Sequence, residues 1–215
     1  MKDLFLKDNM GITTGKDKEF ISFSSVELEN SFKDSKSISQ VSYRPFDARF
    51  LYYKQDLLAR PRPDFMKHLK DRDNIALTSI RRSRDNKVVS PFVARNLIDK
   101  CIISTLDNAN IFPLYLYSDG DSQQTIKDIQ ERTSNLQADI VNTICEKIGL
   151  NFALDRDSSE NSFTPIDVLD YIYAVLHSPT YREKYKEFLK IDFPRVPYPK
   201  DTDTFWQLVK LGGEL

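Results

Sequence analysis

Glycine, histidine and cysteine are scarce in this chain of 215 residues. The six glycines are less than half the share of about 7 % found in an average protein, and they form no G-x-G-x-x-G motif for a dinucleotide. The two histidines, His68 and His177, and the two cysteines, Cys101 and Cys145, are too few and too far apart to bind zinc. We therefore expect neither a metal nor a cofactor in this chain. Two cysteines also make no disulfide framework, which favours a reducing cytoplasm.

Long apolar runs are missing as well. No segment approaches the roughly 20 apolar residues that span a membrane, and residues 1–9 lack the apolar stretch of a signal peptide. With 40 % hydrophobic residues the chain nevertheless has enough apolar material to bury a core. We expect a folded protein outside the membrane, made of one domain or of two closely joined lobes.

No combination of residues predicts an active site. His177 and Ser178 are adjacent, but neighbouring residues do not face each other on a helix, so they do not make a nucleophile and its base. Asp64 and Lys67 resemble part of a metal-dependent nuclease site, although no second carboxylate is evident on a neighbouring strand. We keep DNA cleavage around Asp64 as a remote alternative and assign no catalytic residue.

Basic residues are concentrated in one part of the chain. Residues 44–95 contain thirteen Lys and Arg against six Asp and Glu, a net charge of +7, whereas the whole chain carries −1. Nine of the thirteen are Arg, whose planar guanidinium suits bidentate contacts to phosphate and guanine. Aromatic residues such as Phe46, Phe50 and Phe65 are interleaved with them and are expected to form a packed framework. The segment predicts a cationic surface for nucleic acid, with a solvated face as the alternative.

The first part of the chain has the pattern of strands and loops. Short alternating or β-rich runs predict strands, and the stretch after Pro63 has apolar residues at helical spacing. The strands are expected at residues 19–24, 41–43, 50–53, 74–80, 100–106 and 111–117, and the short helix at 64–71. The polar, basic residues 81–87 predict a loop or a hairpin tip.

Beyond the turn at residues 118–121 the pattern becomes helical. Helices are expected at residues 137–148, 165–177, 179–189 and 205–211. Thr164 can cap the second of these, and Gly149 and the pair Gly212-Gly213 are expected to end the first and the last. We therefore predict an α+β fold, in which a β-rich basic lobe of residues 1–118 packs closely on a helical lobe of residues 119–215.

Several sequence phrases, spread over nearly the whole chain, carry a resemblance to a known family. They are Gly11-Ile12-Thr13-Thr14-Gly15-Lys16-Asp17; Tyr43-Arg44-Pro45-Phe46-Asp47 with Tyr52-Tyr53; Arg60-Pro61-Arg62-Pro63 with Met66 and His68-Leu69; Phe112-Pro113-Leu114-Tyr115-Leu116-Tyr117; Tyr171-Ile172-Tyr173-Ala174-Val175-Leu176-His177-Ser178-Pro179 with Tyr181-Arg182 and Tyr185; Phe193-Pro194-Arg195-Val196-Pro197-Tyr198-Pro199; and Phe205-Trp206 with Leu211-Gly212. Together they resemble the C-terminal specificity region of single-polypeptide restriction–modification enzymes, the type ISP class. The stretch that begins at Tyr171 is the most specific.

Enzymes of this class join a nuclease, a helicase-like translocase, an adenine-N6 DNA methyltransferase and a target recognition domain. The resemblance implies that this chain recognises double-stranded DNA at a specific sequence, beside methyltransferase and helicase-like domains of the same polypeptide. The methyltransferase's Asn-Pro-Pro-Tyr motif and its glycine-containing cofactor loop are absent from these 215 residues. We therefore expect a fragment, or a truncated reading frame, without transferase activity of its own, and S-adenosylmethionine in the adjoining methyltransferase domain.

Two groups of residues are predicted to contact DNA. Family members that read different sequences share the first group, which is therefore expected to bind phosphate or to hold the fold: Arg60, Arg62, Lys67 and His68. Residues outside the shared phrases are expected to read bases: Arg81, Arg82, Arg84, Asn86 and Lys87. Arg84→Ala should then relax sequence choice, whereas Arg62→Ala should weaken binding to all DNA and flatten its salt dependence. For Arg44, a phosphate contact and a buried ion pair with Asp47 are equally expected.

A protein-docking module is the main alternative function. In that case the helical part would join the methyltransferase and translocase parts, and the basic face would read no bases. Affinity for short duplexes at low salt distinguishes the two functions, because a docking module should have none.

Overall fold

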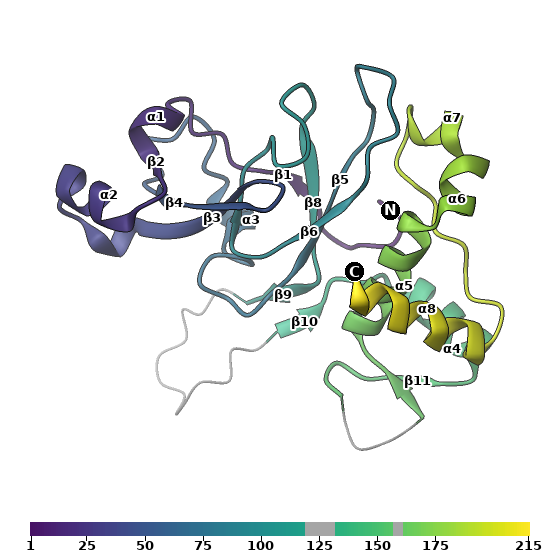
Figure 1. Cartoon of the computed structure of the whole chain (residues 1–215). Helices are drawn as coiled ribbons and strands as arrows, with labels where there is room; N and C mark the ends of the chain where they lie inside the picture. Colours follow the sequence, from purple (N-terminus) through teal and green to yellow (C-terminus); the bar gives the residue numbers. More distant parts are fainter. Residues whose placement is uncertain (119–131, 157–160) are drawn as a thin grey trace, which may run out of the picture.

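A four-stranded antiparallel sheet lies in the middle of the computed structural model, which describes residues 1–118, 132–156 and 161–215 (Figure 1). Its strand order is β1-β8-β5-β6, with β1 at Asn9–Met10, β8 at Ala109–Pro113, β5 at Ala76–Ile80 and β6 at Phe92–Ala94. The register pairs Thr78 with Ile111 on one side and with Phe92 on the other. β1 and β6 are therefore the two edges of this central sheet.

The central sheet is buried on both faces. Successive side chains of a strand point to opposite faces, and in β5 Ala76 and Ile80 join one hydrophobic core while Leu77 joins the other. The same alternation places Ile111 and Phe112 of β8 in different cores. The sheet therefore separates two cores, and the molecule has three layers.

A second sheet covers one face of the central sheet, and we call this the sheet side. Its mixed order is β2-β4-β3-β7, with β2 at Ile21–Ser22, β4 at Asp47–Tyr52, β3 at Ile38–Arg44 and β7 at Leu97–Ile98. Three short helices and a 3-10 turn accompany it: α1 (Asp17–Phe20), α2 (Ser25–Phe32), η1 (Ser35–Ser37) and α3 (Pro63–Met66).

Helices cover the other face, and we call this the helical side (Figure 1). They are α4 (Ala138–Ile148), α5 (Pro165–His177), α6 (Pro179–Lys184), α7 (Lys186–Leu189) and α8 (Thr202–Glu214). Two small sheets lie with them: β9 (Tyr115–Tyr117) with β10 (Arg132–Ser134), and β11 (Asn151–Phe152) with β12 (Ser162–Phe163). The α+β class is therefore confirmed. So is the capped start of α5, where the side chains of Thr164 and Asp167 form a capping box.

Several predicted elements are wrong in detail. The predicted strand 111–117 is divided between β8 and β9, and the predicted helix 179–189 between α6 and α7. Three others differ more. Residues 100–106 form turns rather than a strand, because the side chains of Asp99 and Ser104 accept hydrogen bonds from nearby backbone N–H groups. Residues 19–24 contain the end of α1 and only two strand residues. Gly212 and Gly213 do not end the last helix, which continues to Glu214; a Cβ at Gly212 would lie 1.9 Å from the carbonyl oxygen of Asp170, so this glycine allows α8 to approach α5.

The division of the chain at residue 118 stays a prediction. Residues 119–121, which belong to the turn predicted to divide the two lobes, lie outside the described residues. Met1, Phe5 and Phe112 pack in the helical-side core, and the N-terminal ammonium of Met1 donates to the carbonyl of Pro194 at 3.1 Å. Within the described ranges no helix is long and apolar enough to cross a membrane.

Candidate nucleic-acid interface

The basic residues 81–87 form a fixed loop at the upper end of β5 in Figure 1, next to α7. The Ser83 N–H donates to the carbonyl of Lys190 at 3.1 Å, and the Arg84 N–H donates to the Asp107 carboxylate at 3.3 Å. Within the loop, the Lys87 N–H donates to the Ser83 hydroxyl at 3.2 Å, and Asn86 takes a left-handed φ of 57°. Two hydrogen bonds to residues outside the loop and one within it therefore fix the loop backbone.

The side chains of the loop remain exposed, as predicted for Arg81, Arg82, Arg84, Asn86 and Lys87. Three of them pair loosely with acids: Arg81 with Asp192 at 3.2 Å, Arg84 with Asp107 at 3.6 Å and Lys87 with Asp85 at 3.1 Å. Arg82 makes no ion pair with another described residue. Exposed pairs contribute only about 0–1 kcal/mol, so a phosphate or a base edge can replace Asp192 and Asp85, whereas Asp107 is buried.

A hollow lies between this loop, the ends of β1 and β8, and the residues that follow α7. Besides the loop, it is lined by Met10, Asn108, Asn110, Lys190 and Ile191. Amide groups both donate and accept hydrogen bonds, so Asn108 and Asn110 add base-reading chemistry to the arginines. The sequence predicts strand β8 only from residue 111, so Asn108 and Asn110 are not among the predicted contacts. The correct strand pairs Ala109 with Ile80 and so places these amides beside the loop.

Of the other predicted group, Arg60 and Arg62 lie along the β1 edge of the central sheet. The guanidinium of Arg62 donates to the Asn9 side chain at 2.8 Å and to the Gly11 carbonyl at 3.2 Å, and burial lowers its pKa. Arg60 is exposed, and its backbone pairs with Thr13. A second hollow, lined by Lys7, Asn9, Arg62 and Asp64 among others, opens here. Strand β1 joins the two hollows, because Asn9 lines this one and Met10 lines the first.

His68 does not lie at this surface. Its side chain is only 2 % exposed, and its Nδ1 accepts a hydrogen bond from the Tyr117 N–H at 3.0 Å. The predicted phosphate contact of His68 is therefore wrong, because a buried ring cannot touch the DNA backbone. Lys67 is partly exposed directly after α3, and its phosphate contact stays a prediction.

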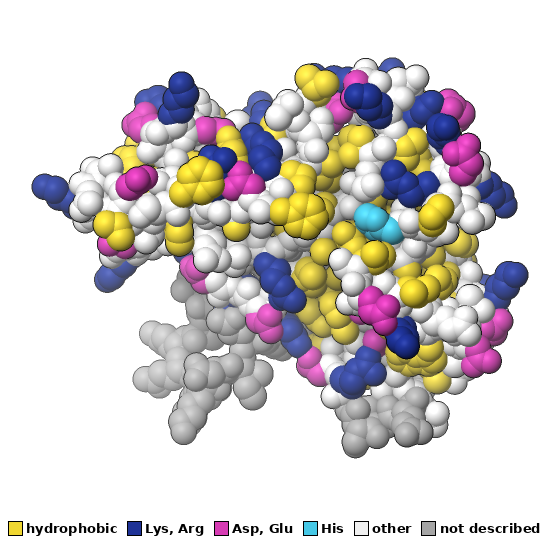
Figure 2. Space-filling view, in the orientation of Figure 1, with side chains coloured by type: hydrophobic (Ala, Val, Ile, Leu, Met, Phe, Trp, Pro, Cys, Tyr) yellow, Lys and Arg dark blue, Asp and Glu magenta, His cyan; other side chains and the backbone are white. Residues whose placement is uncertain are grey.

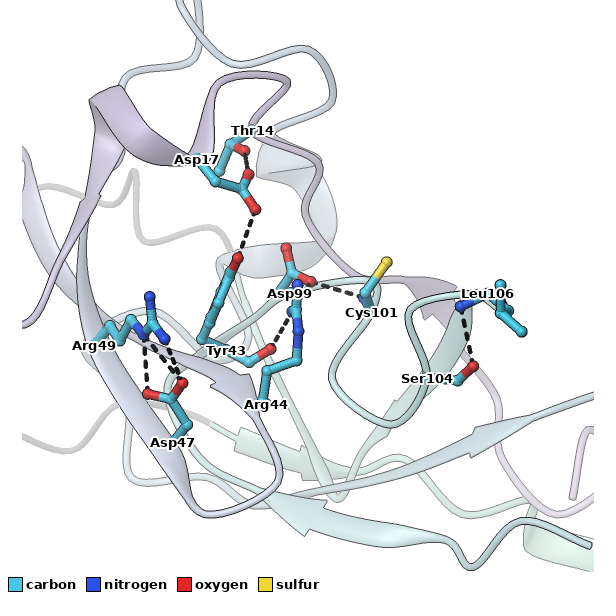
Figure 3. Close-up of polar contacts among 10 residues, drawn as sticks. All are labelled: Thr14, Asp17, Tyr43, Arg44, Asp47, Arg49, Asp99, Cys101, Ser104 and Leu106. Atoms are coloured by element: carbon cyan, nitrogen blue, oxygen red, sulfur yellow. Dashed lines mark hydrogen bonds and ion pairs between the residues drawn. The ribbon is translucent and has the colours of Figure 1, made fainter.

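The hairpin of β3 and β4 uses its arginines internally (Figure 3). Arg44 pairs with the buried Asp99 at 2.8 Å, not with Asp47. Asp47 instead receives three hydrogen bonds from Arg49, at 3.0, 3.1 and 2.7 Å, and these hold the pKa of its carboxyl below the usual range. Arg44 and Arg49 also lie over the two faces of the Tyr43 ring, at 3.8 and 4.3 Å from its centroid. Both arginines therefore hold the fold.

The basic residues of segment 44–95 do not make one uninterrupted cationic surface. At least eight of the thirteen lie within 4 Å of a carboxylate. Figure 2 shows Lys and Arg side chains interleaved with Asp and Glu on one face of the molecule, with hydrophobic side chains in its middle. The candidate interface is therefore limited to the β1 edge and the loop, and not the whole segment.

Asp64 lies in the first turn of α3 beside Arg62. Among the described residues, no three His, Cys, Asp or Glu side chains lie together as metal ligands. The nuclease alternative therefore has no ligand set in this part of the chain.

Comparisons with known proteins agree with this fold. A family model described as the Type ISP C-terminal specificity domain matches residues 26–215. No curated protein matches the sequence. The solved structure of a DrdV–DNA complex is similar with a TM-score of 0.77 and 18 % identity, covering 98 % of this chain and 22 % of that one.

Two further structures show the same likeness. LlaBIII, an ATP-dependent Type ISP restriction–modification enzyme bound to DNA, has a TM-score of 0.70 and 20 % identity, over 98 % of this chain and 15 % of that one. A nuclease-deletion mutant of the Type ISP enzyme LlaGI with a DNA substrate mimic has a TM-score of 0.69 and 17 % identity, over 98 % of this chain and 21 % of that one. This chain therefore spans about a fifth, or less, of the length of these structures.

Proposed function

Because this chain belongs to the Type ISP C-terminal specificity domain family, we propose that it recognises a specific sequence of double-stranded DNA. The recognition would serve an adenine-N6 DNA methyltransferase within a restriction–modification polypeptide. The observation that carries the proposal is the basic loop 81–87, which is fixed in its backbone and exposed in its side chains. Similar structures that contain DNA support it.

The loop has a suitable shape for base readout. It connects β5 to β6 and protrudes from one end of the four-stranded central sheet, so its side chains can meet base edges in the major groove of B-DNA. Arg82 and Arg84 can donate to guanine O6 and N7, and Asn86 can pair with adenine. Asn108 and Asn110 lie in the hollow behind the loop and can hold a further base edge or a bridging water.

The β1 edge has a different part in the proposal. Arg60 and Arg62 would hold phosphates of the same duplex and so fix its register. β1 and β5 are separated by one strand, a distance of about 10 Å, so loop and edge lie within a single turn of DNA. Flipping an adenine out of the helix costs a few kcal/mol, so the enzyme must bind the duplex tightly in one register while it does so.

The methyl transfer itself would take place in an adjoining domain. S-adenosylmethionine and the catalytic residues belong there, and the methyltransferase and helicase-like domains are the proposed protein partners. The residues present here lack the catalytic motif and the glycine loop, so we assign this chain no step of the reaction. We expect the assembled enzyme in the cytoplasm, with the DNA that it reads.

Two single substitutions test the division between base reading and phosphate contact. Arg84→Ala should relax the sequence that the chain selects from a randomised duplex pool, with a loss of about 1–3 kcal/mol on the selected site only. Arg60→Ala should weaken selected and random duplexes alike and reduce the salt slope by about one. Arg60 replaces Arg62 in this test, because Arg62 also holds the Gly11 carbonyl.

Lys210→Ala is the matched control, since Lys210 is an exposed base on α8, away from the β1 edge. It should leave binding unchanged. Equal losses on both duplexes for Arg84→Ala and Arg60→Ala would refute the division of labour. No duplex affinity of the unmodified chain at low salt would refute DNA recognition and leave the docking function.

A further inference from the structure

Phe46 is the most exposed large hydrophobic residue in the described part of the chain. Its side chain is 96 % exposed at the turn between β3 and β4, and its backbone has a left-handed φ of 60°. Bulky residues avoid this conformation, which glycine and asparagine accept more easily. The sequence predicted Phe46 as part of a packed framework, and that prediction is wrong. Exposing the ring to water and holding the backbone in this conformation both cost free energy in the isolated fold. A binding partner that covers the ring would explain why Phe46 stands here.

The turn presents this ring rigidly. Asp47, the next residue, is held by Arg49, and Arg44 is held by Asp99. The edge of the Phe46 ring meets the ring of Phe92 in β6, with centroids 5.1 Å apart and planes at 88°. The ring therefore has a fixed direction while nearly all of its surface is free.

The Phe46 ring lies close enough to the loop of residues 81–87 for one duplex to reach both. Phe92 follows Lys87 by five residues, which is at most about 18 Å of extended chain and well under the 34 Å of one turn of B-DNA. A duplex that engages the loop therefore passes within reach of Phe46.

We propose that Phe46 stacks on a nucleobase of the bound DNA, as a wedge at an opened base step or beside an unpaired base. This inference rests on the proposed function and adds a second contact point on the β6 edge of the central sheet. A lone, flat, protruding ring fits between stacked bases. A protein partner would instead be expected to use the wider hydrophobic area in the middle of the face in Figure 2.

Duplexes with and without one unpaired base test the proposal. Opening the stack is easiest at an unpaired base, so the 215-residue chain should bind the bulged duplex roughly tenfold more tightly than the paired one. Phe46→Ala should remove this preference, measured by fluorescence anisotropy at low salt. Phe23→Ala is the matched control, because Phe23 is also exposed (73 %) but its ring is covered by Arg49 at 4.2 Å. It should keep the preference.

Two further variants separate binding from folding. Phe46→Trp should keep the affinity and gain a DNA-dependent quenching that the parent chain, with Trp206 as its single Trp, does not show. Phe46→Asn suits the left-handed backbone, so it should melt at the same temperature or higher while it loses the preference. A bulge preference that survives in Phe46→Ala and Phe46→Asn overturns the proposal and assigns the ring to a protein interface. If the parent chain binds no DNA at all, the proposed function itself has failed.

Discussion

The two sides of the central sheet are held together by different interactions. On the helical side, α5 and α8 touch closely enough for Gly212 to be required, and the contacts are mainly between apolar side chains. On the sheet side, charged groups are part of the structure, since Arg44 reaches the buried Asp99 and Arg49 lies between the rings of Phe23 and Tyr43.

This difference shows how to interpret the basic segment. Arg44, Arg49, Arg82 and Arg84 look alike in sequence, but the first two are neutralised inside the sheet side and the last two stand at the end of the sheet in water. The local net charge of +7 therefore overstates the cationic surface. Stability on the helical side should depend mainly on shape, with the half-buried Asp170 as an exception, whereas stability on the sheet side should depend on charge pairing.

The largest effect is expected from Gly212→Ala. Its new Cβ would lie 1.9 Å from the Asp170 carbonyl oxygen, which is backbone and cannot move aside, so α8 must separate from α5. Overpacking of this kind should cost about 3 kcal/mol or more of unfolding free energy, measured by urea denaturation.

Gly213→Ala is the matched control, because its Cβ would be 3.4 Å from the Asp170 Oδ2, an ordinary contact. It should be neutral or add a few tenths of a kcal/mol through helix propensity. Similar losses for the two variants would contradict the role of shape.

Arg44→Ala should have the next largest effect. Removing the guanidinium leaves the carboxylate of Asp99 buried without its partner, which should cost about 2–3 kcal/mol of unfolding free energy at pH 8, less than for a fully buried pair because Arg44 is partly exposed. Burial already raises the pKa of Asp99, and loss of Arg44 removes a group that lowers it. The variant can relieve the cost by protonating Asp99, so its loss should be smaller at pH 5 than at pH 8.

The double variant Arg44→Ala/Asp99→Asn completes the test. It removes both charges and should recover part of the lost stability. DNA affinity per folded molecule should change little in Arg44→Ala, because this arginine faces the protein. A loss of affinity in a variant that is still fully folded would show that Arg44 contacts DNA after all.

The helical side was also the more predictable of the two. α4 and α5 are long enough for an apolar period to appear, and Thr164 and Gly149 mark their ends by local chemistry. Strands such as β1 and β7 have two residues each, too few for any period, and their partners lie far away in the sequence. The sequence predicts Gly212 as a helix end because the close approach of α5, which requires a glycine here, is a tertiary contact.

The candidate site was predictable only where local polarity decided it. The run from Arg81 to Lys87 is polar enough to require exposure, and the structure exposes all of it except Ser83. His68 stands beside basic residues in the sequence but points inwards, toward Tyr117. Phe46 looked like core, and no sequence signal separates it from Phe50. The strained turn that exposes Phe46 appears only when β3 and β4 are paired.

The smallest effect is expected from Asp170→Asn, which tests the charge dependence of the helical side. Burial, and then the neighbouring Asp167, raise the pKa of Asp170 to about 6. Because the folded pKa lies above the unfolded value of about 3.9, the folded state binds the extra proton, and stability falls as the pH rises from about 4 to 6. Asparagine removes this loss, so the variant should be more stable by about 1 kcal/mol above pH 7, a value reduced for the partial exposure of the group.

Asp167→Asn is the matched control with the opposite sign, since Asp167 accepts the Thr164 N–H in the capping box at 2.8 Å. If thermal melting between pH 4 and 8 gives parallel curves for Asp170→Asn and the parent chain, Asp170 is ordinarily solvated and the helical side depends on shape alone.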